Sequence, residues 1–469
     1  MQTKFTIGGA RMIEKTVQQL ANMIQVHNDI SSFQDQTVQG VSINSKSIQQ
    51  GNLFIPLKGE KHDGHEFVEQ AMRQGAGASL WQKDVPNPPT DLPILIVDGT
   101  LEALQQLARV YRDELSLKVV AVTGSNGKTT TKDILAEVLS VKHKVQKTSG
   151  NFNNHIGLPL TILGLQKDTE VAVLEMGMSN FGEIDFLTKM AKPDAAIITN
   201  IGDAHLQELG SREGIAKAKL EIVNGLKSGG LFVYPGDEPL IVSQLMHMDK
   251  PWKIRTFGKS AKNDYYPTKI EMSASGSVFT INQSDITFNL PILGEYNVLN
   301  SMAAMIVARE WGVPFSSINE GFSKIKLTQM RLEMIPGING CQILNDAYNA
   351  SPTSMKAVID LVADLPGFDK KIVVLGDMLE LGPREQEFHK EVGRHIHPEK
   401  INYVYTYGEL GKHIAVGAKE KFDTNRCFSF TDKTALIEHL KPKLDNQTIV
   451  LVKASRGMRL EEVVEGIKL

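Results

Sequence analysis

The middle of the chain contains short, continuous apolar runs separated by amphipathic stretches. The runs are 118–123 (KVVAVT), 171–176 (VAVLEM), 195–200 (AAIITN) and 231–234 (LFVY). Runs of this length without polar alternation are typical of strands buried on both faces of a parallel sheet. Residues 129–140 have one apolar face and predict a helix, 297–311 predict a longer helix, and 268–290 alternate in polarity like shorter strands. This pattern predicts a central α/β unit.

The last third of the chain alternates regularly between strand-like and helix-like segments. The strand-like runs are 342–345 (QILN), 372–375 (IVVL), 402–407 (NYVYTY) and 448–452 (TIVLV). Such alternation indicates a parallel sheet with right-handed crossovers, as in Rossmann-like folds. Gly376 and Gly382 do not form a G-x-G-x-x-G turn, so an NAD site is not favoured.

The first hundred residues have a mixed α/β pattern. Residues 52–57 and 94–97 predict strands, 65–75 predict a helix that ends at Gly75, and 101–114 predict a helix leading into the central unit. The proline-rich run 85–93 predicts a loop, because proline cannot donate to a strand ladder.

Length and composition support three globular domains. At roughly 150 residues per domain, 469 residues correspond to about three. The charges nearly balance, at 51 Lys and Arg against 54 Asp and Glu, whereas a bulk nucleic-acid binder needs a basic surplus. Two cysteines, Cys341 and Cys427, exclude a disulfide framework and a four-cysteine zinc site, and they favour a reducing compartment.

The N-terminal segment has no recognisable targeting signal. Charged residues interrupt its apolar pieces; they are Lys4, Arg11, Glu14, Lys15 and Asp29. A signal peptide needs about 7–15 apolar residues in a row and a membrane span roughly 18–20, and no window of the sequence reaches that. We therefore expect a cytoplasmic protein that does not insert into membranes.

The strongest chemical motif is TGSNGKTTT, at 123–131. It follows a predicted buried strand and opens a predicted helix, which is the context of a phosphate-binding loop. Its glycines allow backbone N–H groups to approach phosphate oxygens, and the helix N-terminus adds positive potential. We expect Lys128 to contact the β- and γ-phosphates and Thr129 to offer its hydroxyl to Mg²⁺. Val122 stands where the first glycine of the usual pattern belongs, but strand, loop, Lys-Thr and helix together argue against a chance turn.

Two further residues follow predicted strands. Glu175 ends the run 171–176, and His205 comes soon after the run 195–200. Ligands bind at the carboxyl edge of a parallel sheet, and Mg²⁺ prefers oxygen ligands. Beside a phosphate loop, a metal role for Glu175 is favoured over a solvated strand-end acid. His205 is a metal or phosphate neighbour at the same edge, although a surface histidine is the alternative.

Other polar residues are ambiguous when taken alone. Lys219 lies on a predicted helix and fits either a site or a solvated face. The two asparagines of GEYNVLN (294–300) can recognise a base edge or cap the helix that begins there. Arg331, Asp346 and Arg456 are isolated charges, which are usually surface residues.

Taken together, the motifs resemble those of the ATP-dependent Mur ligase family over almost the whole chain. They are TGSNGKTTT (123–131), GNFNNHIGLPLT (150–161), LEMGMSNFGEI (174–184), TNIGDAHL (199–206), AKAKLEI (216–222), GEYNVLN (294–300), RLE (331–333), NDAYNASPTSM (345–355), LGDMLELG (375–382) and KASRG (453–457). The family's loop also lacks the first glycine. The resemblance implies a mixed α/β UDP-substrate domain (1–98), a central P-loop parallel-sheet ATPase domain (99–330) and a C-terminal Rossmann-like ligase domain (331–469).

The resemblance also implies roles for individual residues. For ATP these are Gly124, Ser125, Asn126, Gly127, Lys128, Thr129, Thr130, Asn297, Arg331 and Asp346. For the substrates they are Ser45, Lys46, Asn151, Asn153, Asn154, Ser179, Tyr348 and Asn349. Metal ligands are Thr129, Glu175, His205 and Lys219 as a carbamate, and Lys128, Lys219 and His205 are the catalytic set. Lys46 replaces an arginine of the family, and lysine cannot make the same planar two-pronged contact.

The activity implied by the resemblance is amide-bond formation driven by ATP. Within the family, the asparagine-rich 150–161 stretch and the 345–355 motif favour the member that adds D-alanyl-D-alanine to a UDP-N-acetylmuramoyl-tripeptide through an acyl phosphate. The implied cofactors are ATP, Mg²⁺ at two sites and a carbamylated lysine. We expect a monomer that binds no nucleic acid.

Three alternatives remain at this point. The first is a sister Mur ligase or a folylpolyglutamate synthase, against which the 345–355 motif argues. The second is a P-loop kinase or ATPase without ligase activity, which would turn over nucleotide with no second substrate. The third is a nucleotide-binding scaffold without catalysis.

Overall fold

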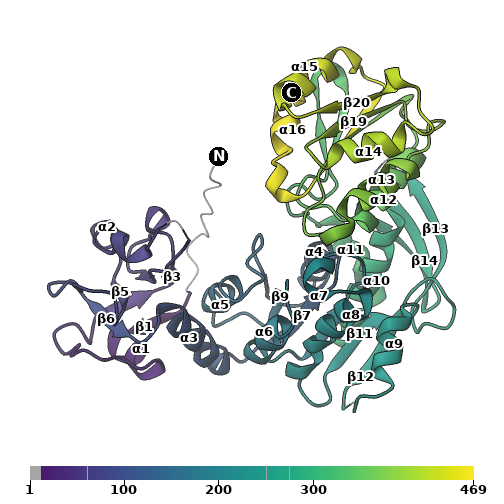
Figure 1. The fold of residues 1–469 in the computed structure, drawn as a ribbon. Helices are drawn as coiled ribbons and strands as arrows, with labels where there is room; N and C mark the ends of the chain where they lie inside the picture. Colours follow the sequence, from purple (N-terminus) through teal and green to yellow (C-terminus); the bar gives the residue numbers. More distant parts are fainter. Residues whose placement is uncertain (1–11, 61, 250, 274) are drawn as a thin grey trace.

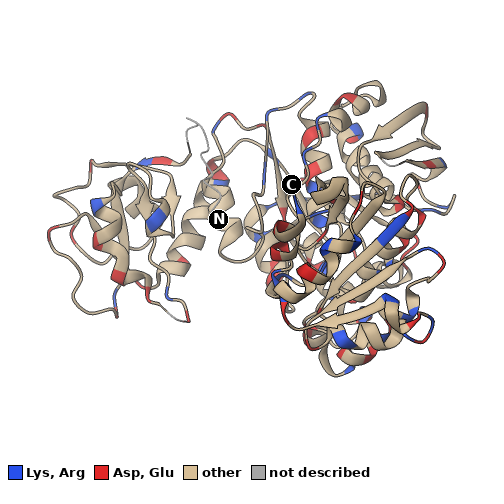
Figure 2. Ribbon diagram, turned by 90° about the horizontal axis from the view of Figure 1, so that it is seen from above, with Lys and Arg blue, Asp and Glu red and all other residues tan. Residues whose placement is uncertain are grey.

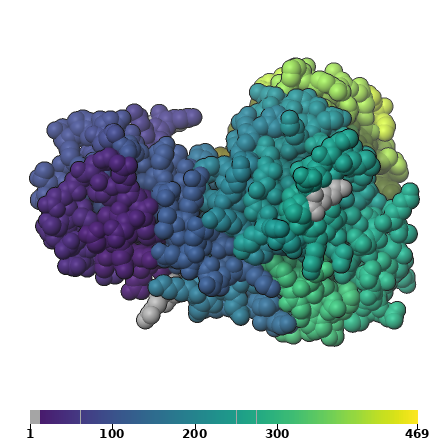
Figure 3. Space-filling view, turned by 90° about the horizontal axis from the view of Figure 1, so that it is seen from below, coloured from purple at the N-terminus to yellow at the C-terminus, as the bar shows by residue number. Residues whose placement is uncertain are grey.

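A computed structural model describes residues 12–60, 62–249, 251–273 and 275–469 (Figure 1). Lys4 and Arg11, part of the argument against a targeting signal, lie outside these residues. In Figure 1 the N-terminal part (purple) lies to the left, the central part (teal) in the middle and the C-terminal part (yellow-green) at the upper right. The space-filling view shows the N-terminal part as a separate lobe (Figure 3). Acidic and basic residues are interspersed over all three parts (Figure 2).

The central part is built on a six-stranded parallel sheet in the order β12-β11-β10-β7-β9-β8. The strands are β7 (Lys118–Thr123), β8 (Val145–Lys147), β9 (Val171–Glu175), β10 (Ala195–Ile198), β11 (Leu231–Pro235) and β12 (Lys253–Phe257). Val122 pairs with Glu175, and Thr123 pairs with Ile198. Strands β7, β9 and β10 therefore end level with one another, and the residues that follow them emerge at one edge. All four strands predicted for this part are confirmed.

Both faces of this sheet are covered by helices. Val120 and Val122 face a core that contains α4 (Lys128–Leu139) and α10 (Glu295–Glu310). Val119 and Ala121 face the opposite core, with α6 (Glu183–Ala191) and α8 (Arg212–Leu220). Two-sided burial explains why the strand sequence is continuously apolar. The remaining helices of this part are α5 (Gly157–Leu163), α7 (Leu206–Leu209), α9 (Pro239–Leu245) and α11 (Ile318–Ser323).

A three-stranded antiparallel sheet flanks the first of these cores. Its strands are β13 (Pro267–Ser273), β14 (Gly276–Ile281) and β15 (Ser284–Leu290), as the alternating polarity predicts. Phe279 and Phe288 pack against each other and against Phe322 of α11.

The N-terminal part contains a four-stranded parallel sheet in the order β3-β4-β5-β6. Its elements are β1 (Glu14–Thr16), α1 (Val17–Met23), β2 (Thr37–Gln39), β3 (Val41–Ser42), β4 (Leu53–Phe54), α2 (Val68–Arg73), β5 (Ala78–Gln82) and β6 (Ile94–Val97). The strand predicted at 94–97 is confirmed, and the one predicted at 52–57 is only two residues long. The predicted helix at 65–75 begins as a 3-10 turn and ends at Arg73. Helix α3 (Thr100–Glu114) joins this part to the core of the central sheet.

The C-terminal part has a six-stranded sheet in the order β16-β17-β21-β18-β19-β20, of which only β16 is antiparallel. Its strands are β16 (Glu333–Pro336), β17 (Gln342–Asn345), β18 (Lys370–Gly376), β19 (Tyr403–Tyr407), β20 (Cys427–Phe430) and β21 (Thr448–Lys453). Its helices are α12 (Pro352–Asp364), α13 (Glu385–His395), α14 (Gly411–Ala418), α15 (Lys433–Leu440) and α16 (Glu461–Ile467). The predicted Rossmann-like alternation is confirmed. Within the described ranges, no helix combines the length and hydrophobicity needed to cross a bilayer.

A buried histidine holds the turn that follows β18. His389 Nε2 accepts a hydrogen bond from the Met378 backbone N–H at 2.9 Å, and its Nδ1 lies 2.6 Å from the Glu385 carbonyl oxygen. Burial lowers the pKa of His389 below its ordinary value of 6.5. A proton on Nε2 would remove the acceptor and leave the Met378 N–H unpaired.

This arrangement predicts a loss of stability in acid. Below pH 6.5 the unfolded chain takes up a proton that folded His389 does not bind, so the free energy of unfolding falls as the pH drops from 6.5 towards the lower folded-state pKa. The unfolded chain binds at most one more proton at this group than the folded protein, so the slope of the unfolding free energy is at most about 1.4 kcal/mol per pH unit. Urea unfolding at pH 5 to 8 should show this slope in the wild type and a smaller one in His389→Gln. The same substitution at exposed His247 should leave the slope unchanged, and an unchanged slope in His389→Gln would contradict the prediction.

Candidate active site

The phosphate loop joins β7 to α4 and requires glycine at two positions. Gly124 has φ +148°, and a Cβ there would lie 1.8 Å from Thr199 Oγ1. Gly127 has φ +78°, and a Cβ there would lie 2.8 Å from the Asn300 side-chain amide. The neighbouring strand end fixes the loop, since the Asn126 N–H donates to Asn200 Oδ1 at 3.0 Å. Close packing and this hydrogen bond thus fix the predicted loop at the carboxyl edge of the sheet.

The Lys128 side chain folds back over this loop. Its Nζ donates to the Gly124 carbonyl at 2.7 Å and to the Ser125 carbonyl at 3.3 Å. Burial lowers the pKa of Lys128 to about 8, with the carboxylate of Glu175 opposing this shift and the positive charge of Arg331 adding to it. The ammonium thus lies in the loop with few competing anions, which suits it to bind an incoming phosphate.

Glu175 presents a carboxylate oxygen without a hydrogen-bond partner. Its Oε1 accepts a hydrogen bond from Asn153 Nδ2 at 2.8 Å. Its Oε2 is buried and makes no hydrogen bond with any described residue, although Lys132 Nζ lies 3.7 Å away. A buried carboxylate oxygen in this state is costly unless a cation completes its surroundings.

His205 lies at the same edge in a left-handed conformation, with φ +63°. Burial, followed by the charges of Lys128 and Lys219, lowers the pKa of its imidazole to about 4. Its Nδ1 is buried and lies 3.1 Å from Glu380 Oε2 without hydrogen-bond geometry. A neutral imidazole keeps a lone pair that can coordinate a metal ion.

Lys219 is fully enclosed on α8 and only 2% exposed. In the part of the chain that the structure describes, no carboxylate lies within ion-pair distance of its Nζ. Burial, and then repulsion from Lys128, holds the pKa of Lys219 well below its ordinary value. The solvated helix face considered from the sequence is therefore wrong for this lysine, and its surroundings favour the neutral amine.

The C-terminal part brings its own carboxyl strand ends against this edge. Ser351, the N-cap of α12, donates from Oγ to Asn126 Oδ1 at 3.4 Å. Thr353 Oγ1 donates to Asp203 Oδ2 at 2.6 Å. With the Glu380–His205 contact, these residues make the carboxyl ends of the parallel strands in the two sheets face each other across the phosphate loop.

One side of the site lies next to the segment that connects the central and C-terminal parts. It is formed by Arg331, Tyr348 and Asp346. Arg331 Nη2 donates to Thr129 Oγ1 at 3.4 Å, and its guanidinium lies 4.2 Å from the centre of the Tyr348 ring. Asp346 is buried, and its Oδ2 accepts from Lys453 Nζ at 2.5 Å. Arg331 and Asp346 are therefore not ordinary surface charges.

Several of the predicted site residues make hydrogen bonds to residues close to them in the sequence. Asn297 Nδ2 donates to the Leu293 carbonyl at 2.7 Å and its Oδ1 accepts from Asn300 Nδ2 at 2.9 Å, so both amides are bonded at the start of α10. Asn154 Oδ1 accepts from the Gly157 N–H at 2.9 Å in the first turn of α5. The remaining residues are also placed: Asn151 and Asn349 are exposed, the Ser179 N–H donates to Glu183, and Arg456 pairs with Glu461.

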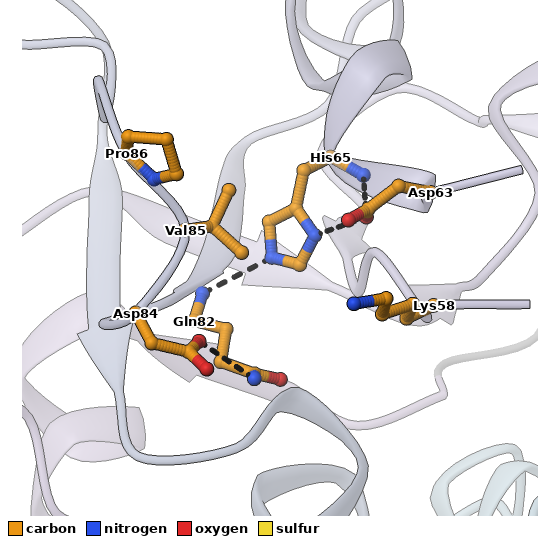
Figure 4. Close-up of a pocket in the computed structure, with 7 residues that line it drawn as sticks. All are labelled: Lys58, Asp63, His65, Gln82, Asp84, Val85 and Pro86. Atoms are coloured by element: carbon orange, nitrogen blue, oxygen red, sulfur yellow. Dashed lines mark hydrogen bonds and ion pairs between the residues drawn. The ribbon is translucent and has the colours of Figure 1, made fainter.

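Ser45 and Lys46 lie in the N-terminal part, away from this cluster. Ser45 is buried and Lys46 is exposed, in a 3-10 turn capped by Asn44. The same part contains a small pocket of about 190 Å³ (Figure 4). It is lined by Lys58, Asp63, His65, Gln82, Asp84, Val85 and Pro86. His65 cannot serve as a free ligand there, because Nδ1 lies 2.6 Å from Asp63 Oδ1 and Nε2 accepts from the Gln82 N–H.

The sequence interpretation missed several residues of the site. Lys132 follows Lys128 by one helical turn, a spacing that would have placed it near the loop. Asp133, Thr328, Glu380 and Lys453 come from four separate segments. Glu380 and Lys453 lie within the quoted motifs 375–382 and 453–457, but only the tertiary structure shows that these side chains approach the site.

These features define a class of protein. A phosphate loop, an unpartnered buried carboxylate, a buried lysine and an opposing sheet edge together form a site for phosphoryl transfer from a nucleoside triphosphate.

Comparisons with known proteins give the family. Family models match at 37–112 (Mur ligase family, catalytic domain), 122–308 (Mur ligase middle domain) and 330–456 (Mur ligase, glutamate ligase domain). The UDP-N-acetylmuramoyl-tripeptide–D-alanyl-D-alanine ligase of Bacillus subtilis is 50% identical over 97% of this chain and 99% of its own length. The chain belongs to the Mur ligase family.

Solved structures of MurF proteins have the same fold. That of Acinetobacter baumannii MurF has a TM-score of 0.87 at 30% identity, covering 97% of this chain and 99% of that one. The MurF ligase of Thermotoga maritima, solved in complex with ADP, has a TM-score of 0.79 at 32% identity, covering 91% and 96%.

Proposed function

We propose that this chain joins D-alanyl-D-alanine to a UDP-N-acetylmuramoyl-tripeptide with hydrolysis of ATP, giving the pentapeptide precursor of peptidoglycan. The observation that carries the proposal is the juxtaposition of the phosphate loop with Glu175, His205 and Lys219, opposite the 345–355 segment. The full-length identity to the Bacillus subtilis ligase supports the choice of substrates.

The chemistry requires activation of a carboxylate. The peptide carboxylate attacks the γ-phosphorus of ATP, the bond to the β-phosphate oxygen breaks, and an acyl phosphate and ADP form. The free amine of D-alanyl-D-alanine then attacks the acyl carbon, loses a proton and expels phosphate. Lys128 neutralises charge on the transferring group, and the facing sheet edges exclude water that would hydrolyse the acyl phosphate.

The residues fit a magnesium ion beside the nucleotide. The unpartnered Glu175 Oε2, the Thr129 hydroxyl and His205 Nδ1 supply polar atoms at one edge. Among the described residues, no three His, Cys, Asp or Glu side chains gather into a closed metal site. This suits Mg²⁺, which usually takes one or two protein ligands and completes its shell with phosphate oxygens and water. When bound, the ion would neutralise phosphate charge.

We propose Lys219 as a carbamate at a second magnesium site. A neutral amine can add CO₂ and lose a proton, which turns the side chain into an anionic oxygen ligand. The lowered pKa and the lack of an ion-pair partner in the described chain support this chemistry. The anionic carbamate would also be attracted to the Lys128 ammonium, which repels a protonated Lys219.

For the substrate-binding residues the proposal follows the family. Contacts to the tripeptide are proposed for Asn153, which donates to Glu175, for Ser179, and for Asn151 and Asn154 on the loop. Tyr348 and Asn349 are proposed for D-alanyl-D-alanine. For the UDP end we propose the 1–98 domain through Ser45 and Lys46, with further domains at 99–330 and 331–469. We also propose that the protein is a cytoplasmic monomer.

The direct test is phosphate release from ATP. We expect release to require both the UDP-linked tripeptide and D-alanyl-D-alanine, because the acyl phosphate is formed on the first and consumed by the second. Each substrate should be omitted in turn, and glutamate or diaminopimelate should replace the dipeptide as controls for the sister ligases. Full-rate hydrolysis without either substrate would instead support an ATPase without ligase activity.

A further inference from the structure

Residues 328–331 connect the central and C-terminal parts and lie along the first two turns of α4. The backbone N–H and Oγ1 of Thr328 both donate to Asp133 Oδ2, at 2.8 and 2.9 Å. Three residues later, Arg331 Nη2 donates to Thr129 Oγ1 at 3.4 Å. Thr129 and Asp133 are one helical turn apart and share a face. The connection therefore runs antiparallel to the helix that begins with Lys128.

Asp133 is a rigid anchor for this connection. Its side chain is 1% exposed, and its Oδ1 lies 3.0 Å from Lys147 Nζ and 3.6 Å from Lys132 Nζ. The two lysines and Thr328 together fix the position of the buried carboxylate.

The backbone on either side of Arg331 is held in an unfavourable conformation. Met330 has φ +60° and Leu332 has φ +49°, and neither is glycine. Such conformations persist only where neighbouring contacts determine them. Here the Leu332 N–H donates to Asp346 Oδ1 at 3.2 Å, while Thr328 is fixed on Asp133. Arg331 is thus held between one carboxylate of each domain.

We propose that Asp133 is a positioning residue for phosphoryl transfer. Through Thr328 it fixes the interdomain connection so that the Arg331 guanidinium stays at Thr129, next to the phosphate loop. The assignment rests on the proposed function for the identity of the reaction. The test below measures nucleotide binding, which does not require the acceptor substrate.

The test uses Thr328, because an uncharged residue at 133 would leave Lys132 and Lys147 uncompensated. Thr328→Val keeps the shape and the backbone donor but removes the hydroxyl, and Thr328→Ser keeps both donors. We expect Thr328→Val to weaken binding of a non-hydrolysable ATP analogue and to lower kcat about tenfold, with unchanged KM for the UDP-linked substrate and unchanged Tm. Thr328→Ser should behave like the wild type. The matched control is Thr268→Val in β13, which should change nothing.

The decisive measurement repeats Thr328→Val in an Arg331→Ala background. If Asp133 and Thr328 act through Arg331, the second substitution should change analogue affinity less than twofold. An equal loss in both backgrounds, or equal damage from Val and Ser, would overturn the proposal. Failure of the proposed function is distinguishable, because the wild type would then show no phosphate release dependent on D-alanyl-D-alanine.

Discussion

Lys128→Ala should reduce turnover by about 1,000-fold while the protein stays folded. The ammonium lies in the phosphate loop, 2.7 Å from the Gly124 carbonyl, and compensates charge that develops on the transferring phosphate. Burial lowers the pKa of Lys128 to about 8, which means that the folded protein holds this ammonium less favourably than water does. Its removal should therefore hardly lower the free energy of unfolding. The measurements are kcat for phosphate release and Tm.

A suitable control for this substitution lies just beyond the same helix. Lys142 is exposed and its Nζ donates to the Gly312 carbonyl at 3.1 Å, so Lys142→Ala should keep near-normal turnover. Wild-type kcat in Lys128→Ala would show that the loop does not serve catalysis.

Lys219→Ala should also lose most activity, and a short carboxylic acid in the buffer should restore part of it. The acid can occupy the space of the proposed carbamate and supply the missing anionic oxygen. Because Lys219 is buried without an ion-pair partner in the described chain, the substitution should not lower Tm through loss of a salt bridge. The measurements are kcat with and without acetate, and the mass of the wild-type protein in bicarbonate.

Helix α8 offers a matched control two residues away. Lys217 is exposed and points towards the Phe181 ring at 5.9 Å, so Lys217→Ala should be nearly silent and insensitive to acetate. A near-normal rate for Lys219→Ala would remove this lysine from the active site. Loss of activity without rescue by acetate, and without a mass increase of one CO₂, would refute the carbamate.

Local sequence predicted the elements whose burial is uniform along their length. Strands β7 and β17 have the predicted bounds, because both faces of each are covered and every residue after the first is buried. Strand β8 escaped prediction, since VQK has no pattern of its own and becomes a strand only by pairing with β9. Strand β5 (ASLWQ) was also missed, between the predicted helix and the proline-rich loop.

The site residues likewise divide into those that the local sequence predicts and those that only the packing of distant segments brings in. Glu175 and His205 were predicted from their positions after strands, and the structure brings both to one edge with Lys128. The burial of Lys219 and the Asp133–Thr328 contact depend on packing between segments far apart in the chain, which no local pattern records. The metal and substrate roles carried over from the family remain predictions.

The two outer domains are attached to the centre by different kinds of contact. Residues of the N-terminal domain, such as Leu53 and Leu80, share one continuous apolar core with Leu174 of the central sheet. Among the described residues, the C-terminal cores include only Leu293 from the centre. The contacts described above across that boundary are between polar or charged side chains. Water can replace such pairs at little cost, whereas separating an apolar core is expensive. Heat should therefore detach the C-terminal domain first, and calorimetry should record the other two domains melting together.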